Sequence, residues 1–356
     1  MRGDSAFLAC LFRSLWLTRR VRDRLTDEVE CRTHLTRLVH ASLGEAAYEL
    51  VRSEAAGTQR LLLFARAAGP AACESLSSLR CWKVDTGGAG VFNKGGIGLS
   101  FALSPAPPPP PPGAPADAPH RPPPLRIALV GTHGPAHGGA ERVAARSASL
   151  AAVLSGGDDT PVSATSLPFA PGGLLRGGGG GSPAGLETSH DHVFVFGDLN
   201  YRIDGEWGAV GDAIRRRDWG SLAGSDELGA ERSAGRALVD YTEGPLSFPP
   251  TYKLVRPSEG GGGGKRRAAR GGGEGAGGGT GGGGGVTSAV SAVNAVNAVN
   301  APVYAASRVP SWTDRVLFRT GAGARPPARL TAYGPSFAVA TSDHAPVSAT
   351  FLLPLG

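Results

Sequence analysis

The chain has 356 residues, of which 55 are Gly and 29 are Pro, and its formal net charge is +6 at pH 7. Much of the Gly and Pro lies in runs that cannot build a core, so we expect one well-buried domain of about 250 residues. The positive charge permits an anionic partner, although an excess of Arg is often plain solvated surface. The four cysteines all precede residue 82 without a CxxC pair, which argues against a zinc site or a disulfide scaffold.

Residues 1–56 contain no Pro and carry apolar residues at helical spacing, so they predict helix. The apolar run at 6–17 is too short to span a bilayer and is interrupted by Arg13. We interpret it as an amphipathic helix that packs on a core, and an organellar transit peptide is the alternative. We therefore expect a cytoplasmic protein without a transmembrane segment, with peripheral membrane contact left open.

Apolar runs bounded by turn-forming or polar residues predict β-strands further along the chain, at residues 60–67, 97–103, 125–134, 192–203, 315–318, 336–344 and 346–353. A helical pattern covers 141–154. Strands separated by a helix and by long polar loops indicate an α/β or α+β sandwich.

Three low-complexity stretches interrupt this pattern, a Pro tract at 104–124, a Gly/Ser-rich stretch at 155–186 and a Gly-rich stretch at 259–300. Their composition predicts linkers or loop insertions rather than packed structure. The last of them holds the basic cluster Lys265–Arg270. This cluster could rest on an anionic membrane surface, but a solvated loop is the plainer interpretation.

The segment FVFGDLNYR at 194–202 places Asp198 and Asn200 two residues apart after a buried strand. If the extended geometry continues, both side chains project to one side. A carboxylate beside a carboxamide suits a site that takes a proton from water and donates hydrogen bonds to a phosphoryl oxygen. An ordinary turn is the alternative.

A second segment, TSDHAPV at 341–347, places Asp343 beside His344. Adjacent side chains on an extended chain point in opposite directions, so we expect them to serve different partners, such as a metal or water and a phosphate. A structural His is the alternative.

The third segment, SRVPSWTDRVLF at 307–318, carries arginines suited to phosphate contacts. Its Asp314 could hold the imidazole of His344. The alternative is a surface Asp–Arg pair with Trp312 in the core.

In this order, GDLNYR, FPPTYK (248–253), PSWTDR and SDHAPV resemble the signature set of inositol polyphosphate 5-phosphatases. The segments TGGAGVFNKGGIGLSF (86–101) and THGPAH (132–137) resemble upstream segments of the same family. The resemblance implies a DNase I-like four-layer α/β (α+β) sandwich of two packed sheets flanked by helices. It runs from about residue 44, so we expect a helical segment at 1–43 and a catalytic domain at 44–356.

The family is expected to hydrolyse the 5-phosphate of phosphoinositides, with phosphatidylinositol 4,5-bisphosphate as first choice, or of soluble inositol polyphosphates. The resemblance implies Mg²⁺ as cofactor, and Asp343 would lie near it. Asp198 would orient or deprotonate the attacking water with help from Asn200, and His344, paired with Asp314, would stabilise the phosphoryl oxygens. The implied substrate-binding residues are His133 for the scissile phosphate, Arg308, Tyr252 and Lys253 for the neighbouring ring phosphate, and Asn93 and Lys94 for the inositol pocket.

This sequence departs from the family's pattern at several places. We find neither the first strand with its Asn nor the strand that ends in the Gln-Glu pair, whose Glu is the principal metal ligand. Glu45 and Glu49 are poor substitutes, because they fall on the predicted helix. We therefore expect a sandwich without its first strands, from a truncated gene model or a degenerate paralogue. Thr313 stands where the family has Cys, and Gly134–Pro135 follow His133 in place of Leu–Ala.

Two other functions stay open. The missing Glu favours a catalytically impaired phosphoinositide-binding or scaffold protein. A nuclease of the same superfamily would share GDLN and SDH, but FPPTYK and PSWTDR argue against it. The chain also lacks the interleaved aromatic and basic residues of strand binding, so we expect no nucleic-acid partner.

Overall fold

The computed structural model describes residues 8–14, 32–33, 36–37, 40, 48–66, 75–87, 92–104, 123–156, 185–255, 302–321, 326–338 and 342–353. Apart from their end residues, the three expected insertions lie outside the described residues, and so do the basic cluster Lys265–Arg270 and Glu45.

A six-stranded sheet forms the centre of the molecule, with strand order β4-β5-β6-β7-β9-β8. Its strands are β4 (Ser75–Asp85), β5 (Gly95–Ser104), β6 (Leu125–His133), β7 (His192–Asp198), β8 (Thr242–Glu243) and β9 (Asp314–Thr320). Only β6 and β7 pair in parallel within this sheet. A parallel pair needs a crossover, and helix α3 (Ala140–Ser155) lies on it. Both strands therefore end at the same edge of the sheet.

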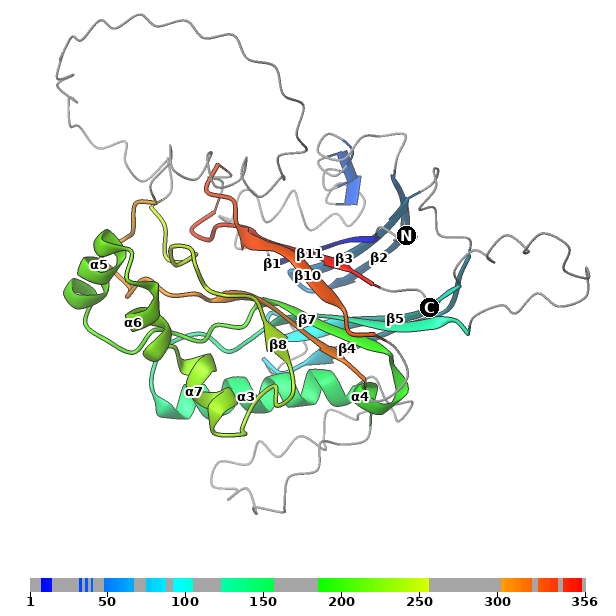
Figure 1. The fold of residues 1–356 in the computed structure, drawn as a ribbon, viewed down its shortest axis with the longest axis horizontal. Helices are drawn as coiled ribbons and strands as arrows, with labels where there is room; N and C mark the ends of the chain where they lie inside the picture. The colour runs from blue at the N-terminus through cyan, green and yellow to red at the C-terminus, as the bar shows by residue number, and fades with distance from the viewer. Residues whose placement is uncertain are drawn as a thin grey trace, which may run out of the picture.

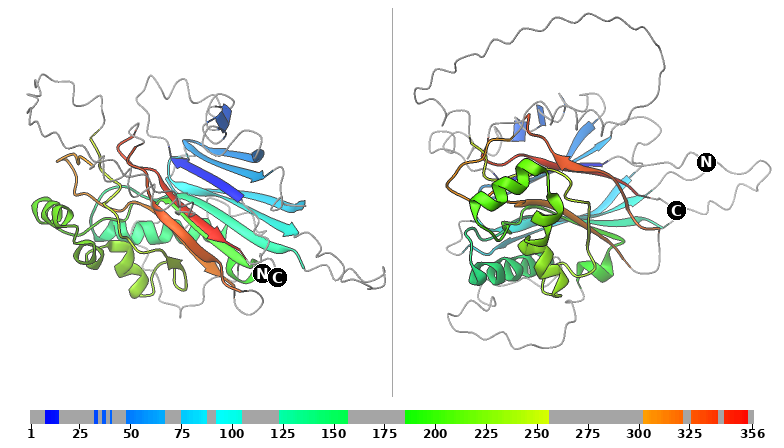
Figure 2. Two further views of the ribbon diagram at one scale, coloured as in Figure 1. Left: turned by 45° about the horizontal axis from the view of Figure 1, so that its top comes forward. Right: turned by 60° about the vertical axis from the view of Figure 1, so that its left-hand side comes forward.

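The remaining strands form two smaller sheets, β1-β3-β2 and β10-β11. Their bounds are Leu8–Ser14 (β1), Tyr48–Ala56 (β2), Gln59–Arg66 (β3), Arg329–Pro335 (β10) and Val347–Leu352 (β11). Figure 1 shows both small sheets on one side of the six-stranded sheet and the helices of residues 140–233 on the other, and the views in Figure 2 agree. The expected sandwich of two sheet layers flanked by helices is confirmed.

Helices cover the outer face of the six-stranded sheet (Figure 1). Besides α3 they are α4 (Leu186–Ser189), α5 (Trp207–Arg216), α6 (Trp219–Gly224) and α7 (Glu227–Ser233). In the described part of the chain, no helix combines the length and the apolar character needed to cross a membrane.

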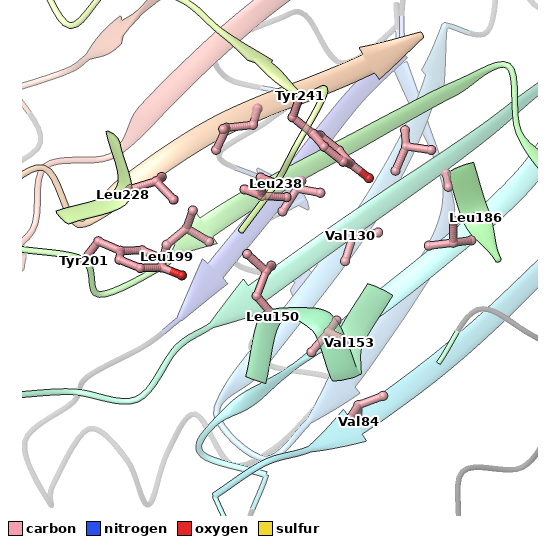
Figure 3. Close-up of a cluster of buried hydrophobic side chains, with 14 residues drawn as sticks. Val84, Val130, Leu150, Val153, Leu186, Leu199, Tyr201, Leu228, Leu238 and Tyr241 are labelled. Carbon is pink, nitrogen blue, oxygen red and sulfur yellow. The ribbon is translucent and has the colours of Figure 1, made fainter. Parts of the chain in front are cut away.

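The six-stranded sheet is buried on both faces, because successive side chains of a strand point to opposite faces. On β6, Val130 packs into the core beneath α3, against Leu150 and Val153 (Figure 3). The alternate residues Ile127 and Leu129 pack into a second core.

This second core lies between the two sheet layers. The Phe351 ring of β11 lies 4.8 Å from the rings of Phe194 on β7 and Phe318 on β9, measured between centroids. From β3, Leu61 and Leu63 join the same core. Strands of both layers are therefore fixed by contacts near the middle of the molecule.

The predicted helix over 1–56 was wrong in two places. Residues Leu8–Ser14 form β1, which pairs with β3 along its whole length, and Tyr48–Ala56 form β2 in a hairpin with β3. Helical residues in this region are found at 32–33, 36–37 and 40 of the described part. Short apolar runs fit either period, and pairing with the buried strand β3 decides the outcome.

The predicted strand over 336–344 was also wrong. Strand β10 ends at Pro335, and among the described residues of 336–344 the chain bends, with one isolated bridge from His344 to Tyr252. The bend carries the SDH motif away from the small sheet and toward the edge where β7 ends.

Candidate active site

Three predicted site residues lie side by side at one edge of the six-stranded sheet. His133 ends β6 and pairs in register with Asp198, which ends β7. Asp198 in turn lies opposite Asp314, the first residue of β9. All three therefore meet because their strands end or begin at the same edge, where Asp198 and His133 are buried.

Asp198 and Asn200 are held together by two hydrogen bonds. The backbone N–H of Asn200 donates to Asp198 Oδ1 at 3.0 Å, and its Nδ2 donates to Oδ2 at 3.0 Å. We predicted that a continuing strand would bring the two side chains to one side. Instead the strand ends at Asp198, and Asn200 has a positive φ of 61°. Asn tolerates this left-handed conformation better than most residues. Asn200 Nδ2 also donates to the Gly134 carbonyl at 3.0 Å, which ties two loops together.

Asp314 and His344 form the second pair, with 2.9 Å between Asp314 Oδ2 and His344 Nδ1. Two hydroxyls, Thr251 Oγ1 and Thr313 Oγ1, donate to the same carboxylate oxygen at 2.8 Å each. The Tyr252 ring lies 4.5 Å from the His344 ring, centroid to centroid. These contacts fix both the carboxylate and the imidazole.

The residues of the two pairs shift one another's pKa values. Burial alone would lower the pKa of His344, but the Asp314 and Asp198 carboxylates outweigh it and raise the pKa to about 9. Burial also opposes ionisation of Asp314, yet His344 and the two threonine hydroxyls lower its pKa. For Asp198, burial dominates and raises the pKa. The site therefore holds an imidazolium close to a carboxylate that is a better base than an exposed Asp.

Lys94 and His133 make a third close contact, with 2.5 Å between Lys94 Nζ and His133 Nε2. Burial, with Lys94 as a further cause, lowers the pKa of His133 well below its ordinary value. Burial lowers the pKa of Lys94 to about 8. A neutral His133 thus accepts a hydrogen bond from the Lys94 ammonium group, and Lys94 brings positive charge to the site.

The other predicted site residues are placed less tightly. Lys253 is half-buried, and its carbonyl accepts from Ala305 N at 2.9 Å. The side chains of Arg308 and Asn93 are exposed, although a backbone hydrogen bond of Asn93 reaches His133.

Asp343 is buried, and its carbonyl accepts from Leu254 N at 2.8 Å. Its charge helps to raise the pKa of His344. Glu49 is exposed on β2 and lies on a strand, not on the predicted helix.

Several residues of this site were missed from the sequence. Arg202 Nη2 donates to Asn200 Oδ1, and its Cζ lies 4.5 Å from the centroid of the Tyr252 ring. The Thr251 hydroxyl holds Asp314. Both residues belong to the quoted motifs GDLNYR and FPPTYK, so the signal was present. The motifs did not reveal how the loops bring these residues together.

An ion pair between buried Arg146 and half-buried Glu227 supports these loops from α3. Arg146 Nη2 donates to Glu227 Oε2 at 2.6 Å, and its Nη1 donates to the His137 carbonyl at 2.6 Å. Glu227 Oε2 also accepts from the backbone N–H of Arg202 at 2.8 Å. The loop after β6 and the loop after β7 are therefore held by one pair of side chains.

Arg315, predicted as a phosphate ligand or a surface ion pair, is neither. Its guanidinium is buried and donates to Asp226 and Glu243. Trp312 is fully buried, as its alternative interpretation required. Arg315 therefore stabilises the start of β9 from inside the protein.

The site offers carboxylate oxygens that could hold a divalent metal ion. Within the described residues, ligand atoms of Asp198, Asp314 and His344 lie within 4.8 Å of one another. Mg²⁺ takes one or two carboxylates and completes its shell with waters and substrate phosphates, so Asp198 and Asp314 offer suitable oxygens. An imidazolium at His344 is no ligand. Asp343, predicted to lie near the metal, is outside this group.

Cys81, the cysteine whose side chain is described, is free and half-buried. Burial raises its thiol pKa to about 12, so this thiol is not suited to act as a nucleophile at neutral pH.

The architecture and this edge of the sheet define a DNase I-like α/β sandwich. Residues 16–260 and 297–350 match the sequence model of the Endonuclease/Exonuclease/phosphatase family 2. The chain belongs to this family.

Among its relatives, phosphatidylinositol 3,4,5-trisphosphate 5-phosphatase 2 of Mus musculus is 28% identical over 162 residues, which is 45% of this chain and 10% of the relative. Synaptojanin-2 of Homo sapiens is 45% identical over 65 residues, 18% of this chain and 4% of the relative. The chain thus spans about a tenth or less of the length of these relatives.

A solved structure shares the fold. It is the inositol polyphosphate 5-phosphatase domain of SPsynaptojanin in complex with inositol (1,4)-bisphosphate and calcium ion. The TM-score is 0.60 at 19% identity, and the match covers 97% of this chain and 74% of that one. At this identity the likeness concerns the fold, and the chemistry has to be argued from the site.

Proposed function

We propose that this protein hydrolyses the 5-phosphate of phosphoinositides, with phosphatidylinositol 4,5-bisphosphate as the first substrate to test, or of soluble inositol polyphosphates. One observation carries the proposal: the Asp198 carboxylate and the Asp314–His344 pair approach within 4.8 Å at the ends of adjacent strands. The relatives named as 5-phosphatases support it.

Asp198 acts on the attacking water. A carboxylate whose pKa burial raises is a stronger base than an exposed one. Its two hydrogen bonds from Asn200 fix its orientation, and the charges of His344, Lys94 and Arg202 oppose the rise in its pKa. A water placed between Asp198 and the substrate would therefore be oriented for attack as it loses its proton.

His344 stabilises the charge that develops on the phosphoryl oxygens. With a pKa of about 9 it is an imidazolium at neutral pH, and phosphoryl transfer depends mainly on positioning and charge stabilisation. Asp314 binds Nδ1 of the ring, which leaves Nε2 to donate to the substrate. His133, which is neutral and accepts from the Lys94 ammonium group, would hold that group beside the scissile phosphate.

The phosphate that neighbours the reacting group is assigned to Tyr252, Lys253 and Arg308. Tyr252 packs on His344, so a phosphate bound there would lie close to the reacting centre. Asn93 and Lys94 line the inositol pocket. Lys94 adds positive charge beside His133, which favours a substrate that carries several phosphates.

Magnesium would be held by Asp198 and Asp314, and when bound it would neutralise phosphate charge. The negative charge of Asp343 would help to keep the pKa of His344 high. The protein is proposed to work in the cytoplasm, with peripheral contact at a membrane when the substrate is a lipid.

The test measures phosphate release from short-chain phosphatidylinositol 4,5-bisphosphate and from a soluble inositol polyphosphate, each with Mg²⁺ and with a chelator. We expect Mg²⁺-dependent release that Asp198→Ala abolishes. Arg329→Met, a change at an exposed residue of β10, serves as the matched control and should leave release unchanged.

Binding of the lipid without turnover above the Asp198→Ala level would overturn the enzymatic function. That result would favour a phosphoinositide-binding or scaffold protein.

A further inference from the structure

Arg202 lies between the two halves of the candidate active site. It follows Asn200 by two residues in the loop after β7, and its Nη2 donates to Asn200 Oδ1. Its Cζ lies 4.5 Å from the centroid of the Tyr252 ring, which in turn packs against His344. The guanidinium is therefore directed into the site by a hydrogen bond on one side and an aromatic ring on the other.

The charge of Arg202 is not neutralised within the described part of the chain. Two buried arginines, Arg146 and Arg315, have carboxylate partners: Arg146 pairs with Glu227, and Arg315 pairs with Asp226 and Glu243. Among the described residues, Arg202 forms no ion pair, and its Nε is buried without a hydrogen-bond partner. The buried Nε alone does not distinguish Arg202, because Nε of the paired Arg146 also has no partner. What distinguishes it is a guanidinium at the site without a carboxylate partner, which suits an anion that arrives with the substrate.

A second cation lies close to the same part of the site. Lys94 Nζ lies 2.5 Å from His133 Nε2, and the charges of Lys94 and Arg202 act on one another and on the Asp198 carboxylate. A phosphate that binds beside Arg202 would therefore meet a second positive charge.

We propose that Arg202 is a phosphate-binding residue, whose unpaired donors receive oxygens of a substrate phosphate lying between Asn200 and Tyr252. The proposal rests on the proposed function, which it deepens by naming this ligand. Arg suits this position because its planar fork binds phosphate through parallel, charge-assisted hydrogen bonds. Tyr252 and Asn200 hold the fork in place before the substrate arrives.

Inorganic phosphate is the probe, and its affinity is measured by calorimetry with the full chain, in chelator and in Mg²⁺. Arg202→Gln keeps a donor for Asn200 but removes the charge and the fork, and we expect its phosphate affinity to fall at least tenfold. Arg202→Lys keeps the charge without the fork, and we expect a smaller loss. Arg329→Met removes one exposed charge and should bind phosphate as the wild type does.

Wild-type affinity in both Arg202 variants, with unchanged circular dichroism, would overturn the proposal. A lower melting temperature with unchanged phosphate affinity would also overturn it, because Arg202 would then be structural only.

The two proposals fail in different ways. If the wild type binds phosphate through Arg202 but releases none from inositol phosphates, the proposed function is wrong and the binding role stands. If the wild type turns over its substrate while Arg202→Gln keeps its phosphate affinity, only the role of Arg202 is wrong.

Discussion

The Asp314–His344 pair lets us predict how the protonation of His344, and with it the reaction rate, depends on pH. Asp314→Asn keeps the shape of the side chain and removes the charge that lies 2.9 Å from His344 Nδ1. In the wild type, the surrounding carboxylates lift the pKa of His344 from 6.5 to about 9 against the opposing effect of burial. At about 1.4 kcal/mol per pH unit, this favours the imidazolium by roughly 3 kcal/mol.

In Asp314→Asn the burial of His344 remains and its principal counter-charge is lost, so we expect a pKa near or below 6.5. At pH 7.5 the protonated fraction of His344 would fall from roughly 97% to roughly 9% or less. If the imidazolium stabilises the transition state, the rate at this pH falls about tenfold from protonation alone.

The assay has two parts. An NMR titration of the His344 ring in metal-free protein, assigned with His344→Gln, reports its pKa directly. The pH–rate profile should lose activity as pH rises through about 9 in the wild type and at lower pH in Asp314→Asn. The folded pKa of His344 is raised, so its contribution to stability is complete below about pH 6.5 and is lost as pH rises through about 9. An unchanged His344 titration in Asp314→Asn would refute the reasoning.

Three further predictions concern the supporting structure. Arg146→Met leaves half-buried Glu227 without its ion-pair partner and should lower the free energy of unfolding by about 1–3 kcal/mol in urea, of which Arg146→Met/Glu227→Leu should recover part. Thr313→Val removes a hydroxyl donor from Asp314 and should lower kcat/KM about fivefold, since such a bond contributes about 1 kcal/mol. Gly98→Ala would place a Cβ 2.0 Å from the Trp82 ring and should cost about 1–3 kcal/mol, measured by thermal unfolding.

Each of these has a result that contradicts it. Equal stability of Arg146→Met and wild type would mean that this ion pair does not clamp the loops. Thr313→Ser should retain the activity that Thr313→Val loses, and a drop in both would assign the effect to packing. Gly208→Ala on α5, where an added Cβ meets no atom within 4 Å, is the control for Gly98→Ala and should not destabilise.

The central strands could be predicted because they are buried on both faces. The runs that became β6 and β7 are almost continuously apolar, and they end where polar residues begin. Strand β4 was not predicted, because its sequence SLSSLRCWKVD mixes Ser, Arg and Lys with apolar residues at the edge of the sheet. For β1 and β2, pairing with β3 overrode an apolar spacing that fits a helix.

The site could be predicted as far as its motifs reach. Asp198 and Asp314 were singled out at the ends of predicted strands, and His344 was singled out by its motif SDHAPV. The structure brings ligand atoms of the three residues within 4.8 Å of one another, although His344 lies in a bend and not on the predicted strand. The contacts of Arg202 and Thr313 could not be read in advance. They depend on the left-handed turn at Asn200 and on an isolated bridge between Tyr252 and His344, residues far apart in the chain.

Because β6 and β7 pair in parallel, the connections that lead into these strands lie at the opposite edge of the sheet from the candidate active site. Both strands run toward the edge that carries His133 and Asp198, so β6 and β7 begin, and β5 ends at Ser104, at the opposite edge. Lengthening such a connection adds only loop-closure entropy, about 0.6 kcal/mol per doubling. The low-complexity tracts at 104–124 and 155–186 can therefore drift in length and composition over evolution while the register at the site stays fixed. The same two positions are natural points at which to insert a reporter domain.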